Sequence, residues 1–100
     1  MITSDVYMWD CFAQVYAKQD AFAEARRIIL EALHFNPDSA LLYYRLAAYY
    51  LLNDEQLRGM AVLKNTLKAY PEECDCFFDV FEPGDNDSEI IALINQYRKP

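Results

Sequence analysis

The chain has 100 residues, of which 54% are hydrophobic and only two are glycine, so the composition indicates one folded, helix-prone domain. Its formal net charge is −7 and it lacks clustered Lys and Arg, which argues against binding to nucleic acid or to an anionic membrane surface. The N-terminus has no basic start before an apolar run, and no stretch approaches the ~18 apolar residues of a bilayer span, so we expect no secretory signal and no membrane helix.

The three cysteines do not resemble a disulfide framework, because their number is odd and the chain is helix-prone. Cys74 and Cys76 are two residues apart, which on a helix places them on nearly opposite faces and does not suit a metal ion. With Cys11, we expect them to be reduced thiols in the cytoplasm, and we expect no metal or other cofactor.

The first part of the chain predicts two helices. Ser4 or Asp5 can cap a first helix that runs to about Lys18, with large apolar residues at helical spacing. After a short turn, a second helix carries an apolar stripe and ends before Pro37.

The next part predicts the same arrangement again. Asp38 or Ser39 can cap a third helix, and a fourth runs from about Glu55 to Ala69. Pro71 closes this second pair and can also open a fifth helix, because proline fits the first helical turn.

Residues 74–100 predict a shortened third pair. The apolar pattern continues at Phe77 and Val80, but the Glu-Pro-Gly-Asp segment at 82–85 ends that helix early. A final apolar helix starts near Asp87 and reaches about Arg98. We expect it to cover the apolar face that a stack of helix pairs leaves open at its end.

The two complete pairs repeat each other at an offset of 34 residues, the separation of Pro37 and Pro71 (71 − 37). Large residues match large ones and small residues match small ones at seven positions. The matched residues are Trp9 and Tyr43, Phe12 and Leu46, Ala13 and Ala47, Tyr16 and Tyr50, Ala25 and Gly59, Ile29 and Leu63, and Ala32 and Thr66. A glycine inside a helix costs about 1 kcal/mol relative to alanine, so Gly59 predicts a close approach between helices.

This pattern resembles the tetratricopeptide repeat, a helix-turn-helix unit of this length, over residues 6–71 and in degraded form beyond. The resemblance implies an all-α fold of about six antiparallel helices stacked as a short right-handed superhelix. It implies a single domain with repeats at 6–39 and 40–73 and degenerate capping helices at 74–100. It also implies a non-catalytic scaffold that binds a peptide or helix of another protein.

The resemblance further implies a concave groove lined by set positions of the first helix in each unit. The candidate residues at these positions are Tyr7, Asp10, Gln14, Tyr44, Arg45, Ala48, Leu51, Asp75, Phe78, Asp79 and Glu82, with Ala17 and Leu41 beside them. Among the tyrosines of the third helix, only Tyr44 faces the groove in this scheme.

Two interpretations of the groove residues are open. Aromatic anchors surrounded by carboxylates suit a partner segment with basic and apolar residues. Alternatively, Tyr44 and Phe78 belong to the core and the carboxylates are only solvated. The family members that bind acidic chaperone tails use Lys and Arg where this sequence has Asp10, Asp75 and Asp79, so we exclude such tails as partners.

The first helix presents Met8, Phe12 and Val15 at the positions that, in this family, pack against a preceding unit. Only residues 1–4 precede this helix. Three explanations are open: the chain is the C-terminal part of a longer array, a second copy covers the face as a homodimer, or the apolar residues are simply exposed.

The residues do not indicate an enzyme. His34 is the only histidine, so no Ser, His and Asp/Glu set can be assembled, and two glycines cannot form a glycine-rich phosphate loop. Besides the groove-binding scaffold, two other functions remain open. One is a self-associating structural module, and the other is a small dedicated chaperone for a secreted bacterial subunit.

Overall fold

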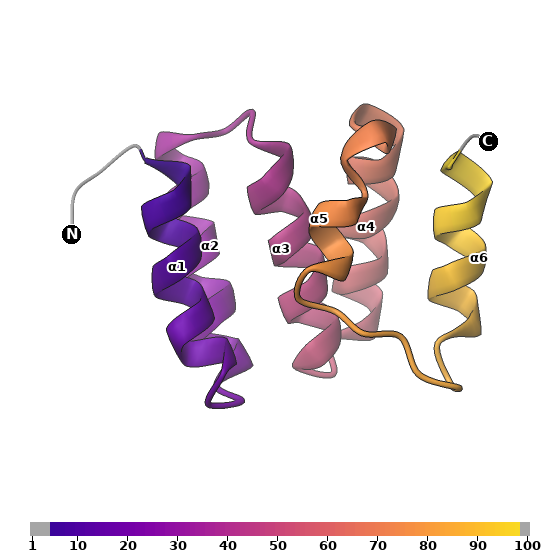
Figure 1. Cartoon of the computed structure of the whole chain (residues 1–100), viewed down its shortest axis with the longest axis horizontal. Helices are drawn as coiled ribbons and strands as arrows, with labels where there is room; N and C mark the ends of the chain where they lie inside the picture. Colours follow the sequence, from indigo (N-terminus) through magenta and orange to yellow (C-terminus); the bar gives the residue numbers. More distant parts are fainter. Residues whose placement is uncertain (1–4, 99–100) are drawn as a thin grey trace.

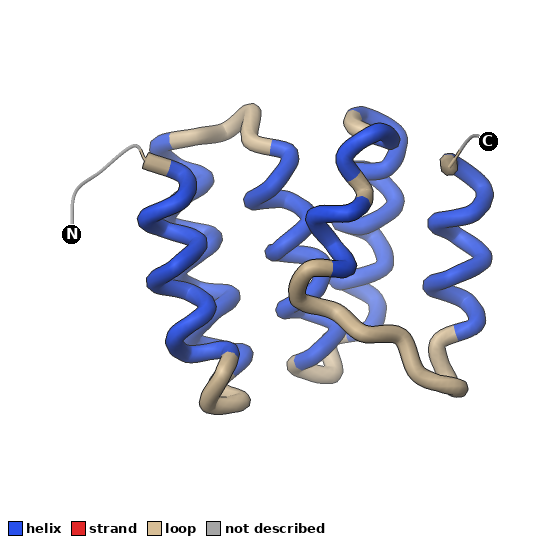
Figure 2. Tube along the Cα trace, viewed as in Figure 1, coloured by secondary structure: helices blue, strands red, loops and turns tan. Residues whose placement is uncertain are grey.

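The computed structural model describes residues 5–98, and within them every regular element is a helix (Figure 2). The elements in chain order are α1 (Val6–Ala17), α2 (Phe22–Phe35), α3 (Ala40–Leu52), α4 (Gln56–Ala69), the short 3₁₀-helix η1 (Pro71–Glu73), α5 (Asp75–Phe78) and α6 (Ser88–Tyr97). None of these helices is long and apolar enough to cross a membrane.

The four long helices α1 to α4 form a stack in which neighbours in sequence are neighbours in space (Figure 1). α1 and α2 form a first antiparallel pair, α3 and α4 form a second, and α2 packs against α3 between them. α5 packs on α3, and α6 packs on α4 at the far end. The predicted all-α, repeat-like architecture is therefore confirmed.

The helix starts follow the predicted capping residues. The Asp5 side chain accepts hydrogen bonds from the backbone N–H groups of Tyr7 (2.9 Å) and Met8 (3.4 Å) at the start of α1. The alternative cap, Ser4, lies outside the described residues. At the start of α3, the Ser39 hydroxyl accepts a hydrogen bond from Leu42 N–H at 3.3 Å. Local capping thus fixes where the first helix of each pair begins.

The turn inside each pair has the same geometry, so the 34-residue offset is present in the backbone. Asp20 and Asp54, 34 residues apart, both adopt the left-handed conformation, with φ of 58° and 60°. Aspartate tolerates this conformation better than most residues. In each turn the next residue donates its N–H back to a tyrosine carbonyl, Ala21 to Tyr16 and Glu55 to Tyr50.

Small residues let the two helices of each pair cross closely, as predicted. Ala13 and Ala25 are fully buried between α1 and α2. In the second pair, a Cβ atom at residue 59 would lie 2.6 Å from Leu51 Cγ and 3.1 Å from Leu51 N. Only glycine therefore fits this crossing without a shift of Leu51.

α3 lies at the centre of the molecule, because it contributes side chains to both parts of the core. The part shared with α1 and α2 contains Trp9, Ala13, Ala25, Ile28, Ile29, Ala32, Leu42, Leu46 and Tyr49. The part shared with α4, α5 and α6 contains Ala40, Tyr44, Ala47, Ala48, Leu51, Leu63, Leu67, Cys74, Phe77, Phe81, Ile90 and Ile94.

The third pair is shorter than the sequence indicated. α5 has four residues and ends at Phe78, five residues before Pro83. Phe81 follows in irregular chain, yet it is buried and stacks on Phe77 with ring centroids 4.9 Å apart. After this irregular segment, α6 buries Ile90 and Ile94 in the second part of the core. The C-terminal helix therefore covers the end of the stack, as expected.

Candidate functional site

A buried ion pair joins the first helix of each complete pair. Arg45 of α3 donates from Nε to Asp10 Oδ1 of α1 at 2.8 Å and from Nη2 to Asp10 Oδ2 at 3.1 Å. The two side chains are only 5% and 8% exposed. Gln14, one turn after Asp10, donates from Nε2 to Asp10 Oδ2 at 3.1 Å. The carboxylate is thus held on both oxygens by a two-pronged guanidinium contact and an amide.

Arg45 also holds the start of the third pair. Its Nη1 donates to the backbone oxygen of Cys76 in α5 and lies 3.3 Å from Asp79 Oδ2. Burial alone would lower the pKa of Arg45, but the hydrogen bonds and charges of Asp10 and Asp79 outweigh it and raise that pKa. One guanidinium therefore connects α1, α3 and the segment around α5.

This network corrects the prediction of an open groove along α3. Asp10, Arg45, Ala48 and Leu51 were expected to face a ligand, but all four residues are buried. The reason is that α5 packs directly on α3 (Figure 1), while Asp10 of α1 pairs with Arg45 from the other side. The guanidinium of Arg45 bonds to Asp10, Cys76 and Asp79 within the protein and does not face a ligand.

Tyr44 is also buried rather than groove-facing. Its side chain is fully inaccessible, and its hydroxyl donates to the backbone oxygen of Tyr70 at 2.6 Å. Burial raises the pKa of Tyr44 well above its ordinary value. The interpretation that placed Tyr44 in the core is therefore the correct one, because α4 and α5 pack on α3 and their apolar residues surround this side chain.

The remaining acidic candidates lie at the surface, and two of them have cationic partners. Asp75 accepts from Arg98 Nη2 at 3.1 Å, and the Arg98 guanidinium lies 6.0 Å from the centroid of the half-buried Phe78 ring. Asp79 contacts Arg45, as described, and Glu82 is exposed. Much of the predicted acidic character of this face is thus neutralised within the chain.

A surface hollow of about 590 Å³ remains between the starts of α1 and α3. Its lining is Val6, Tyr7, Asn36, Pro37, Asp38, Ser39, Ala40, Leu41 and Glu73. Tyr7 is 72% exposed and is the second residue of α1, while Leu41 is the second residue of α3. One open part of the predicted groove therefore lies near these helix starts, with Asp38 and Glu73 as its carboxylates. The candidates Phe78, Asp79 and Glu82 line a separate hollow of about 470 Å³.

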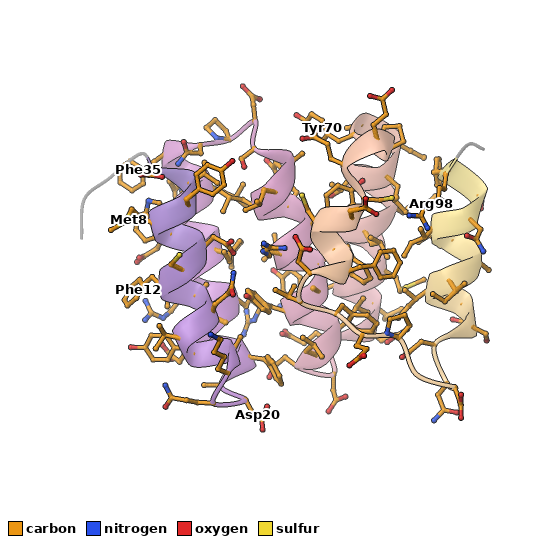
Figure 3. All side chains as sticks on the ribbon, in the orientation of Figure 1. Met8, Phe12, Asp20, Phe35, Tyr70 and Arg98 are labelled. Atoms are coloured by element: carbon orange, nitrogen blue, oxygen red, sulfur yellow. The ribbon has the colours of Figure 1, made fainter. Side chains whose placement is uncertain are left out.

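The outer side of α1 is an exposed apolar strip. Met8 is 52% exposed, Phe12 40% and Val15 54%, whereas the matching residues of α3, 34 positions later, are buried against α2. Phe35 at the end of α2 is 49% exposed and stacks on Trp9 with centroids 5.9 Å apart. Figure 3 shows Phe35, Met8 and Phe12 one above another along this edge.

Comparison with protein-family models, curated proteins and solved structures found no match.

The three thiols and the histidine differ in their exposure. Cys11 is exposed, Cys74 is buried and Cys76 is half-buried, and all three are free thiols. Burial raises the pKa of the Cys76 thiol. His34 is exposed near the end of α2. Within residues 5–98, no group of three or more His, Cys, Asp and Glu side chains is placed to hold a metal ion.

The pairing of Asp10 with Arg45 was not predicted, although the sequence carries a signal for it. α1 and α3 are otherwise apolar or uncharged, and each contains a single charged residue, Asp10 in one and Arg45 in the other. Lone opposite charges on two apolar helices of one bundle are expected to meet, because neither can be buried alone.

Proposed function

We propose that this chain is a non-catalytic protein-interaction module similar to tetratricopeptide-repeat scaffolds. Its ligand is a segment of another protein that carries Lys or Arg beside apolar residues. The observation that carries the proposal is the hollow between the starts of α1 and α3, where the exposed Tyr7 lies beside carboxylates. A cytoplasmic location belongs to the same proposal and is supported by three free thiols.

The chemistry of the hollow favours this kind of ligand. Tyrosine is a frequent anchor of protein interfaces, because it supplies apolar area and a hydroxyl with few rotatable bonds. Tyr7 provides this group, and Leu41 and Pro37 provide an apolar floor. The carboxylates of Asp38 and Glu73, together with the net charge of −7, attract a basic segment and repel an acidic one.

The internal repeat supports the family part of the proposal. The 34-residue offset appears in the sequence matches and again in the left-handed residues Asp20 and Asp54. Tyr7 and Leu41 occupy the same position in successive pairs, so the hollow is a feature of the repeat rather than of one irregular loop. Repeat scaffolds commonly bind ligands across such aligned positions.

Selection from a displayed library of random 12-residue peptides tests this function. We expect enriched peptides to combine Lys or Arg with apolar residues and to lose about tenfold or more in affinity for a Tyr7→Ala/Glu73→Lys variant. Leu57→Ala is the control, because Leu57 is 88% exposed on α4 and does not belong to this lining. If no peptide is enriched, or if the enriched peptides bind the double variant equally well, the proposed function is wrong.

A further inference from the structure

We propose that two copies of this chain form a symmetric dimer through the outer side of α1, with Met8, Phe12, Val15 and Phe35 as its apolar centre. This homodimer does not depend on the proposed peptide binding, because the four residues lie outside the lining of the hollow. In this dimer the α1 strip of one copy packs against the α1 strip of the other.

The internal repeat shows what these positions do when they are covered. Thirty-four residues after Met8, Phe12 and Val15 come Leu42, Leu46 and Tyr49, which are 0%, 5% and 0% exposed. They pack against the apolar residues of α2 in the first part of the core. The α1 strip has the same spacing and remains 40% to 54% exposed. It is therefore built like an interior helix face and lacks a neighbour in the described chain.

Charge favours a second copy over an acidic or basic partner. α1 contains one charged residue, Asp10, which is buried and paired with Arg45. The chain as a whole carries a net charge of −7, so two copies repel each other at most approaches. At the α1 strip there is no exposed charge on the helix to oppose contact. An uncharged apolar strip on an acidic protein is the surface where self-association costs least.

The spacing of the apolar residues along α1 also allows the strip to pack against a second copy of itself. Met8 and Val15 are seven residues apart, about 10 Å along a helix, with Phe12 between them. When two such helices pack antiparallel about a twofold axis, each Met8 meets the partner's Val15 and the two Phe12 rings lie near the axis. Such an isologous contact closes after two copies. At the other end of the stack α6 covers the core, and among residues 5–98 the exposed large apolar side chains include none from α6.

The size of the strip predicts a weak dimer. Four side chains that are about half exposed present on the order of 350 Å² of apolar surface per copy. A standard stable interface buries about 800 Å² per partner, so the apolar centre supplies less than half of that area. We therefore expect dissociation in the micromolar range, and the measurement must extend to high concentration.

Sedimentation equilibrium from about 5 to about 500 µM provides the test. We expect the wild-type mass to rise from one chain to two, and Phe12→Lys to weaken the dimer at least tenfold. Leu57→Lys is the control, because it places the same charge at an exposed apolar residue of α4, outside the α1 strip. Val15→Lys is a second disrupting variant in case Phe12→Lys disturbs the contact of Phe12 with Tyr16. Circular dichroism verifies that each variant keeps its helix content.

A thiol reporter adds geometry to the mass measurement. Cys11 is exposed on α1 beside Phe12, so it lies close to the proposed twofold axis. A short bis-maleimide is expected to link two wild-type chains efficiently and two Cys11→Ser or Phe12→Lys chains poorly. A one-chain mass at every concentration would overturn the proposal. So would a dimer that Phe12→Lys and Val15→Lys leave intact.

Discussion

Replacement of Arg45 by methionine tests the central ion pair of this structure. Methionine keeps much of the apolar length of the arginine side chain but removes the guanidinium. Asp10 would then keep only the amide of Gln14 as a described hydrogen-bond partner, inside a site where its side chain is 8% exposed. The same change removes the donor to the Cys76 carbonyl, so α5 would lose its polar link to α3.

The expected loss is large for a protein of this size. Removing one partner of a buried ion pair costs about 3–5 kcal/mol, because the other charge is left uncompensated. A small domain has a total unfolding free energy of about 5–15 kcal/mol. We therefore expect Arg45→Met to lower the midpoint of urea unfolding severely, and to leave part of the protein unfolded at 37 °C.

A double-mutant cycle separates the ion pair from packing. Adding Asp10→Ala to Arg45→Met removes the stranded carboxylate, so we expect the double variant to recover about 2 kcal/mol relative to Arg45→Met alone. Arg27→Met serves as the control: Arg27 pairs with Glu24 at 2.9 Å, but both side chains are half exposed and little stability should be lost. Strict additivity of the two single changes, or a loss below about 1 kcal/mol for Arg45→Met, would refute the buried pair.

Two further changes test the packing around α3. Gly59→Ala is expected to destabilise the protein by about 1–3 kcal/mol in thermal unfolding, because the added Cβ would meet Leu51. This loss is expected despite the higher helix propensity of alanine. A gain in stability would contradict the close crossing of α3 and α4. Tyr44→Phe is expected to cost about 1 kcal/mol, since its hydroxyl bonds Tyr70, whereas Tyr49→Phe should be neutral or stabilising. The Tyr49 hydroxyl is buried without a hydrogen-bond partner in the described chain, and burial raises its pKa to about 12. Equal losses of stability from Tyr44→Phe and Tyr49→Phe would contradict the hydrogen bonding of one hydroxyl and not the other.

The helix pairs could be predicted because their signals are local or periodic. Caps such as Asp5 and Ser39 and the two prolines at the pair ends each act within a few residues of the chain. The small residues at the crossings act between two helices, but they recur at the same positions in each pair. The 34-residue repetition then extends each local signal to a second site, as Gly59 shows at the crossing of α3 and α4. The exposed strip on α1 also followed from this repetition.

The groove could not be predicted correctly because it depends on where α5 ends and packs. No breaking residue lies between Phe78 and Pro83, so the sequence indicated a longer helix than the structure contains. The burial of Tyr44 follows from that docking, not from the pattern of α3 itself. Asp10 and Arg45 are 35 residues apart in sequence, and only their isolation as single charges on apolar helices points to their contact.

The packing of α6 on α4 has a consequence for how the chain folds. The three largest interfaces join helices that follow one another directly, α1 with α2, α2 with α3 and α3 with α4, so these contacts close short loops and form quickly. During synthesis, each pair can assemble while the next is still being made. α6 must instead reach back past η1, α5 and an irregular segment to find α4. Until α6 has been made and has docked, the apolar side of α4 that it covers stays uncovered, so this face is open to aggregation for longer than the faces shared by consecutive helices.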